Sequence, residues 1–355
     1  MLRPSSATSR SIRVQVSMNM WYPLPWPYNP DCQKVLPPAP GGNEMTAESM
    51  LWLLMTGQVP TTEQSRQLSQ ELASKGQLPA FIEQLIDSLP QTLHPMTQLG
   101  IGVAALNHDS SFQSAYEKGM KKSEYWTHTY EDCINLLARL PALAARIYRN
   151  VYHPGKKIPA IDKDLDLVGN YTNLLGFGGN KNLTEYLRLY IALHGDHEGG
   201  NASAHTSRML SATQCTATLT LELLRSGWLD IGGPLPCVLR GAICTSRLAN
   251  QEVLRWQQAM QKELGDNVTH DQIKEYLWKT LKSGQVVPGY GHGVLRQADP
   301  RFIALQEFCE SRPELMASST IQLVKKTYEV APAVLKEHGK TKNPYPNVDA
   351  TSGKA

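Results

Sequence analysis

Hydrophobic residues recur at helical spacing along most of this chain. In one stretch they fall at i, i+4, i+7, i+8 and i+11, which places them on one face of a buried helix. These positions are Leu183, Leu187, Tyr190, Ile191 and His194. Similar series run from Val253 to Leu264 and from Ile321 to Tyr328. Since no set of alternating runs with hairpin turns accompanies them, the pattern predicts an all-α protein.

Several of these helices have recognisable beginnings and ends. Residues 61–64 and 269–272 both read Thr-x-x-Gln, the spacing of a capping box that satisfies the first free amides of a helix. The first of these helices is expected to end at Gly76 and the second at Gly284. A third helix, with Lys336 and His338 in its last turn, is expected to end at Gly339.

Two proline-containing stretches are expected to interrupt the helices. Residues 21–40 are rich in Pro and Trp and are predicted to be irregular. Pro141 lies inside a helical run at residues 131–150. Because proline lacks an amide hydrogen and its ring clashes with the preceding turn, we expect a break or kink there.

Composition excludes several classes of protein. The chain has 355 residues, of which 41% are hydrophobic, enough for one large domain or two. The net charge of +3 is too small to indicate nucleic acid or an anionic membrane as the main partner. No apolar run is long enough to span a membrane. The six cysteines form no C-x-x-C pair, so we expect free thiols and no zinc site.

The first 30 residues differ from the rest. They contain Arg3, Arg10 and Arg13, several serines and no acidic residue. This composition is typical of a mitochondrial transit peptide and predicts import into the matrix. A disordered start, or an artefact of how the coding region was assembled, would look the same. Without these three arginines, 32 basic residues remain against 32 acidic ones, so the rest of the chain is formally neutral.

The stretch with the most candidate functional side chains is Val286–Arg301, which reads VVPGYGHGVLRQADPR. Alternating glycines allow a ligand to approach the backbone closely, and His292 lies among them. Arg296 and Arg301 follow, and each can form a bidentate contact with a carboxylate or phosphate. With two valines at its start, the stretch suggests a pocket for a small anion beside an apolar group. A Gly-Pro turn with surface arginines is the alternative.

This stretch resembles the signature of the citrate synthase family, P-G-Y-G-H-[AG]-V-L-R-x-x-D-P-R. Three other stretches resemble the same family and occur in its order. They are His194–Ser207 (HGDHEGGNASAHTS), Leu248–Leu254 (LANQEVL) and Lys340–Gly353 (KTKNPYPNVDATSG). The similarity extends from about Pro30 to Gly353.

The resemblance implies an all-α fold in which a large and a small helical domain enclose the site in the cleft between them. We therefore expect a leader at residues 1–29, a large domain at 30–247 and a small domain at 248–355. The family usually forms homodimers, and each of its sites takes residues from the partner subunit.

The resemblance also implies a reaction, the condensation of acetyl-CoA with oxaloacetate and water to give citrate and CoA. Asp349 corresponds to the catalytic base, although an aspartate between Pro and Gly could simply form an Asx-turn. His292 corresponds to the histidine that hydrogen-bonds the oxaloacetate carbonyl. His197 and Arg301 correspond to further oxaloacetate ligands. The residues matching coenzyme A contacts are Val286, Val287, Gly289, Tyr290, Arg296, Lys340, Lys342 and Asn347.

Such a condensation needs a carboxylate base, hydrogen-bond donors at both carbonyl oxygens and cations for the carboxylates. It needs neither a metal nor a redox cofactor. His194 and His197 have an i, i+3 spacing that metal ligands can use. We favour a structural role for His194, because Gly199 and Gly200 follow at once and no H-E-x-x-H motif is present.

Two departures from the family pattern bear on activity. Residues 208–247 contain no histidine, whereas the family has one there that donates to the thioester oxygen; Pro236 or Ser246 takes its place. The sequence stops at Ala355, before the family's helical tail with its arginines and dimer contacts. Alternatives therefore remain: 2-methylcitrate synthase, which uses propionyl-CoA, or a truncated homologue that is impaired or inactive.

Overall fold

The computed structural model describes residues 29–195, 249–291 and 296–352, and these form two compact units. Unit 1 comprises residues 29–36, 185–195, 249–291 and 296–352, and unit 2 comprises residues 37–184. Residues 1–28 of the expected leader and the divergent segment 208–247 lie outside the described part of the chain.

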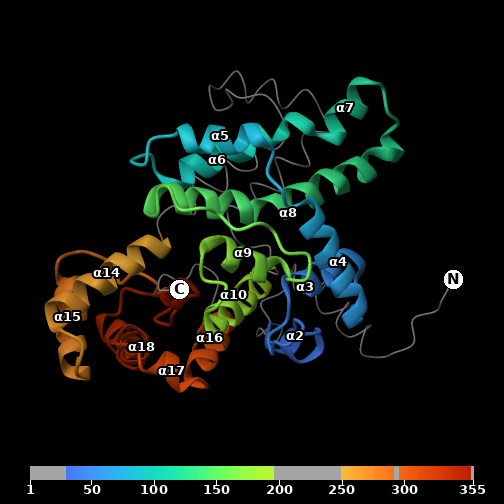
Figure 1. Ribbon diagram of the computed structural model, residues 1–355. Coiled ribbons are helices and arrows are strands. Elements are labelled where there is room, and N and C mark those ends of the chain that lie inside the picture. Colours follow the sequence, from blue (N-terminus) through green and yellow to red (C-terminus); the bar gives the residue numbers. More distant parts are fainter. Residues whose placement is uncertain (1–28, 196–248, 292–295, 353–355) are drawn as a thin grey trace. The chain divides into compact units, whose positions relative to one another are not determined.

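Unit 2 is built around the 28-residue helix α8, Tyr125–Tyr152 (Figure 1). Helices α4, α5, α6, α7 and α9 all pack against it. The other elements of the unit are α3 (Ala47–Thr56), α4 (Thr62–Lys75), α5 (Ala80–Ser88), α6 (Pro95–Ala105), η1 (Leu106–Asp109), α7 (Ser111–Glu117), η2 (Lys122–Glu124), α9 (Leu167–Leu175) and the start of α10 (Lys181–Leu193).

We expected a break or kink at Pro141. There is no break, because α8 continues through this residue. Before the proline, Ile134 and Ala138 pack with α4 in one hydrophobic cluster. After it, Leu143 and Ile147 pack with α5 and α6 in another. A proline inside a helix costs about 3 kcal/mol, and burial of both halves of α8 offsets that cost.

Unit 1 contains the C-terminal helices (Figure 1). Helix α15 packs on α18, while α14 and α16 both pack on α19. The elements are α2 (Asn29–Val35), the rest of α10, α14 (Ala249–Leu264), α15 (His270–Lys282), α16 (Pro300–Glu310), α17 (Pro313–Met316), α18 (Ser319–His338) and α19 (Asp349–Ser352). The core of the α14–α15–α18 group is apolar and includes Met260, Ile273, Leu277, Leu335 and Val287.

Helix ends agree well with the sequence pattern. Both predicted capping boxes are formed, at the start of α4 and of α15. Gly76 and Gly339 occupy the C-caps of α4 and α18, and Gly284 follows α15 with a φ of 81°. Within the described residues there is no named strand, only two isolated bridges, so the all-α prediction is confirmed. None of the helices described there is long and apolar enough to cross a membrane.

Two further details differ from the prediction. Residues 29–35, within the stretch expected to be irregular, form helix α2. In α10 the predicted face, including Leu187 and Tyr190, is only half-buried. The deepest burial falls on a neighbouring face with Leu189, Ala192 and Leu193. Periodicity identified the helix, but the surrounding elements decided which of its faces is most buried.

Candidate active site

Two segments that contain many of the candidate site residues, 286–291 and 340–352, lie side by side in unit 1. Gly289 O accepts a hydrogen bond from Asn347 N at 2.9 Å, and Gly291 N donates to Tyr345 O at 3.1 Å. Between these bonds, Tyr290 and Pro346 form an isolated antiparallel bridge. The backbone before His292 is therefore held directly against the backbone before Asp349.

Gly289 is required by this close approach. Its φ is +80°, and a Cβ placed on it would lie 2.9 Å from the Cα of Ala350. Real Cβ atoms do not come that close to backbone, and only glycine adopts positive φ without steric cost. The glycine thus allows α19 to pack directly on the 286–291 segment.

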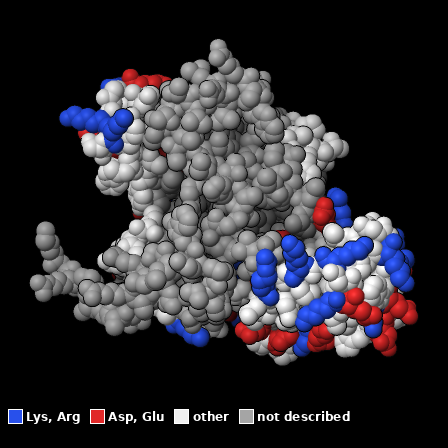
Figure 2. Space-filling view, turned by 180° about the vertical axis from the view of Figure 1, so that it is seen from behind, with Lys and Arg blue, Asp and Glu red and all other residues white. Residues whose placement is uncertain are grey.

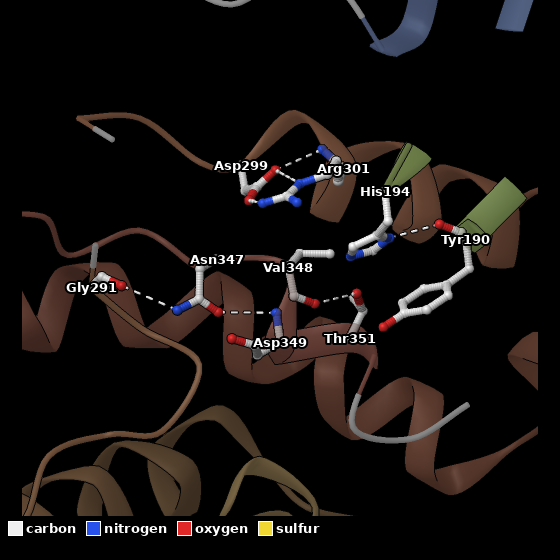
Figure 3. A network of polar contacts seen from close by, with 9 residues as sticks. All are labelled: Tyr190, His194, Gly291, Asp299, Arg301, Asn347, Val348, Asp349 and Thr351. Carbon is white, nitrogen blue, oxygen red and sulfur yellow. Dashed lines mark hydrogen bonds and ion pairs between the residues drawn. The ribbon is translucent and has the colours of Figure 1, made fainter. Parts of the chain in front are cut away.

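The Asn347 side chain links both segments (Figure 3). Its Nδ2 donates to Gly291 O at 3.1 Å, and its Oδ1 accepts from Asp349 N at 3.0 Å. The second bond satisfies a free amide at the start of α19, as an N-terminal cap does. The sequence assigned Asn347 to coenzyme A, whereas here its amide contacts protein backbone at each end.

Asp349 is the first residue of α19 and is half-buried. Burial raises the pKa of its carboxyl above the ordinary value; the positive charge of Arg301 acts against this and the negative charge of Asp299 adds to it. A raised pKa makes a carboxylate a better proton acceptor. The helix that carries it is also tethered from α14, where Gln257 Nε2 donates to Ala350 O at 3.3 Å.

Arg301 lies in the first turn of α16 and is 5% exposed. Asp299, the N-cap of that helix, is 1% exposed and pairs with it. The Asp299 carboxylate accepts bonds from Arg301 N (2.9 Å), Nε (3.1 Å) and Nη2 (2.7 Å). The sequence assigned Arg301 to a substrate carboxylate and gave Asp299 no role; the carboxylate on Arg301 in this structure is that of Asp299.

His194 is a further part of this cluster (Figure 3). Its Nδ1 lies 2.7 Å from Tyr190 O, and because a carbonyl can only accept, Nδ1 carries the hydrogen. Burial lowers the pKa of His194, the Tyr190 carbonyl opposes this, and the charge of Arg301 lowers the pKa further. The ring is therefore neutral at pH 7, with Nε2 as a hydrogen-bond acceptor.

The residues assigned to coenzyme A have different environments. Val287 is 3% exposed and packs in a hydrophobic cluster, whereas Val286 is 76% exposed. Tyr290 is partly buried between two hydrophobic clusters. Arg296, Lys340 and Lys342 are exposed. Figure 2 shows charges of both signs interspersed over the lobe that holds α14, α15 and α18.

Two of the predicted catalytic and binding residues, His292 and His197, lie outside the described residues. Within the described ranges no group of three or more His, Cys, Asp or Glu side chains could hold a metal ion. Sequence reasoning missed Asp299 and Gln257. Asp299 lies within the D-P-R motif and could have been recognised as an N-cap, while nothing in the sequence around Gln257 indicates its contact with α19.

Comparison with known proteins identifies the family. A family model described as "Citrate synthase, C-terminal domain" matches residues 34–222 and 238–355. Residues 1–33 and 223–237 are unmatched, and the second of these ranges lies inside the divergent segment 208–247. The chain is 50% identical over 325 residues to a mitochondrial 2-methylcitrate synthase of Yarrowia lipolytica. It is 50% identical over 324 residues to a mitochondrial citrate synthase of Neurospora crassa.

Each of these alignments covers 91% of this chain and 66% of the relative, so the chain spans just under two thirds of their length. Among solved structures, citrate synthase from Pyrobaculum aerophilum matches 92% of this chain and 73% of its own, at 20% identity and a TM-score of 0.69. The Thermoplasma acidophilum enzyme, in a complex with carboxymethyl coenzyme A and oxaloacetate, matches with a TM-score of 0.62 at 19% identity. These two share the fold. With the family model matching most of its residues, the chain belongs to the citrate synthase family.

Proposed function

We propose that this protein condenses acetyl-CoA with oxaloacetate and water to give citrate and CoA. The observation that carries the proposal is the position of Asp349, a half-buried carboxyl with a raised pKa. It lies at the start of α19, directly against the segment that leads to His292. A base of this kind can take a proton from a weak carbon acid.

In this proposal Asp349 removes a proton from the methyl group of the thioester. The resulting enolate carbon then attacks the ketone of oxaloacetate, which His292 polarises by donating a hydrogen bond. Arg301 binds an oxaloacetate carboxylate, and His197 is a further oxaloacetate ligand. The Asp299–Arg301 pair holds the guanidinium in a fixed orientation before substrate arrives, which lowers the entropic cost of binding a dianion. Hydrolysis of the citryl thioester then releases CoA.

Coenzyme A needs cations for its phosphates. Arg296, Lys340 and Lys342 are exposed and on the same unit as Asp349, and ammonium groups suit phosphates as point charges. The complex of the Thermoplasma acidophilum relative with carboxymethyl coenzyme A and oxaloacetate supports the same ligand pair. We propose that the reaction uses no metal or redox cofactor, since proton transfer and hydrogen bonding suffice for it.

We further propose that the protein acts as a homodimer in the mitochondrial matrix. The names of the Yarrowia and Neurospora relatives, both mitochondrial, support the location. The arginine-rich, acid-free start of the sequence supports it as well.

A second candidate function is 2-methylcitrate synthesis from propionyl-CoA. It is favoured by relatives of that name at 50% identity in Yarrowia lipolytica and 49% in Gibberella moniliformis. One extra methylene in a pocket changes transition-state binding by only about 1–3 kcal/mol. Since both reactions use the same base and the same ketone, a difference of that size decides between them.

Release of CoA thiol from acetyl-CoA and from propionyl-CoA, each with oxaloacetate, tests the proposal. Asp349→Asn should lower oxaloacetate-dependent release by about 100- to 10,000-fold, the usual contribution of a general base. Asp266→Asn, which alters an exposed carboxylate in the same unit, is the matched control and should leave release unchanged.

The acyl-CoA with the higher kcat/KM decides whether the activity is citrate synthesis or 2-methylcitrate synthesis. Residues 208–247 contain no histidine to donate to the thioester oxygen, and loss of one such donor costs about 100- to 1,000-fold in rate. Turnover well below that of an ordinary enzyme of this family is therefore the expected result. Absence of any oxaloacetate-dependent release would refute the proposal for this chain.

A further inference from the structure

We propose that Asn347 is a positioning residue that braces the two catalytic segments against each other, instead of a coenzyme A ligand. The inference rests on the proposed function, because it takes Asp349 as the base and His292 as the ketone donor. Its basis is that one side chain contacts the peptide before His292 and the peptide of Asp349 itself.

The geometry uses both ends of the amide. Nδ2 donates to Gly291 O, the carbonyl that immediately precedes His292, at 3.1 Å. Oδ1 accepts from Asp349 N at 3.0 Å. The bond to Gly291 joins residues 56 apart in sequence, and Figure 3 shows the side chain lying between the two segments.

Only asparagine supplies this pair of contacts at this length. Aspartate keeps the acceptor for the Asp349 amide but has no hydrogen for Gly291 O when it is ionised. Alanine has neither group. Because the backbone amide of Asn347 separately donates to Gly289 O, side-chain variants leave the pairing of the two segments in place. They therefore test the brace and not the pairing.

The base and the ketone donor must act on two substrates held together, so their relative position sets the rate. A displacement of about 1 Å can cost on the order of 100-fold in rate. Loss of the brace should therefore lower kcat without weakening coenzyme A binding. A coenzyme A ligand predicts the opposite, a higher KM for the acyl-CoA with little change in kcat.

The kinetic test compares Asn347→Ala and Asn347→Asp with the control Asn343→Ala. Asn343 lies in the same segment, and its Oδ1 accepts from Tyr345 N at 3.1 Å, so its loss removes a similar local bond. We expect both Asn347 variants to lose about 10- to 100-fold in kcat with KM for acyl-CoA within about twofold. The control should change kcat much less.

The aspartate variant adds a second signature. It introduces a negative charge next to Asp349, and like charges raise a carboxyl pKa. In Asn347→Asp, the acid limb of the plot of kcat against pH should therefore move to higher pH. In Asn347→Ala, which adds no charge, this shift should be absent. A raised KM with unchanged kcat in both variants would overturn the proposal and restore the assignment to coenzyme A.

Hydrogen–deuterium exchange at single-residue resolution, with coenzyme A binding by calorimetry, tests the brace without turnover. The Asp349 amide should exchange faster in Asn347→Ala and remain protected in Asn347→Asp, which keeps the acceptor. The affinity for coenzyme A should be the same in both variants as in the wild type. Unchanged Asp349 exchange in Asn347→Ala would refute the brace. A wild-type chain without turnover refutes the proposed function instead, and the exchange result still decides on the brace.

Discussion

Arg301 Nη2 lies 2.7 Å from Asp299 Oδ2, and both side chains are almost completely buried. The carboxylate also accepts from Arg301 Nε and from the Arg301 amide. A buried pair of this kind adds little net stability, but loss of one partner leaves an uncompensated charge in a low-dielectric site. Under the proposed function, an incoming oxaloacetate carboxylate meets a cation that is already oriented and partly neutralised.

The first prediction concerns Asp299→Asn. Asparagine can still cap α16, but it removes the negative charge beside Arg301. The free energy of unfolding should fall by roughly 3–5 kcal/mol, measured by urea denaturation without ligand. Oxaloacetate should then stabilise the variant more than the wild type, because its carboxylate supplies the missing charge. Equal stabilisation of the two by oxaloacetate would exclude a carboxylate site at Arg301.

The second prediction concerns the pH dependence of Asp349 as the proposed base. Asp349 must be ionised to accept a proton, and its pKa is raised by burial. The acid limb of kcat/KM should therefore lie above the range of an exposed aspartate. The negative charge of Asp299 raises this pKa further, so Asp299→Asn should move the limb to lower pH. A limb that stays in place in this variant would show that another group controls it.

The third prediction compares two glycines with nearly the same backbone. Gly289 and Gly284 have φ of 80° and 81°. A Cβ on Gly289 would lie 2.9 Å from Ala350 Cα, whereas one on Gly284 meets nothing within 4 Å. Gly284→Ala should cost only the strain of positive φ, about 1 kcal/mol.

Gly289→Ala should cost more stability and should also lower kcat, because α19 and Asp349 must move away. Thermal unfolding and kcat, measured on both variants, separate strain from displacement. Equal losses in the two variants would mean that backbone strain alone accounts for the effect.

The fourth prediction lies in unit 2, at a buried carboxyl of α3. Glu48 is 0% exposed, and its Oε1 accepts from Ser69 Oγ (2.9 Å) and Leu167 N (2.7 Å). Burial, with a smaller contribution from the nearby charge of Asp166, raises the pKa of Glu48 from 4.5 to about 7. The folded chain thus retains a proton that the unfolded chain loses above pH 4.5.

Stability from this proton is present below about pH 4.5 and is lost as pH rises through about 7. In that window the contribution of Glu48 to the free energy of unfolding should fall by up to about 1.4 kcal/mol per pH unit. Glu48→Gln carries no such proton and should show a smaller loss between pH 5 and pH 8 in urea denaturation. An identical pH dependence in wild type and variant would contradict a protonated Glu48.

The sequence by itself determined the helices and most of their ends. Capping boxes at Thr61 and Thr269 and the glycines after α4 and α18 were all recognisable. The reason is that a helix terminus is satisfied by side chains within a few residues, so its signal is local. The residue types of the 286–301 segment suggested an anion pocket, whereas the 340–353 segment was assigned to the candidate site by its resemblance to the family.

Only the tertiary structure decided how those segments meet. Asn347 reaches Gly291 across 56 residues, and Gln257 reaches Ala350 across 93; no local pattern encodes such a contact. The continuity of α8 through Pro141 and the burial of Val287 also depend on elements packed from elsewhere. The sequence supplies donors, acceptors and apolar faces, whereas packing selects their partners, because the energy of burial belongs to the whole core and not to any one segment.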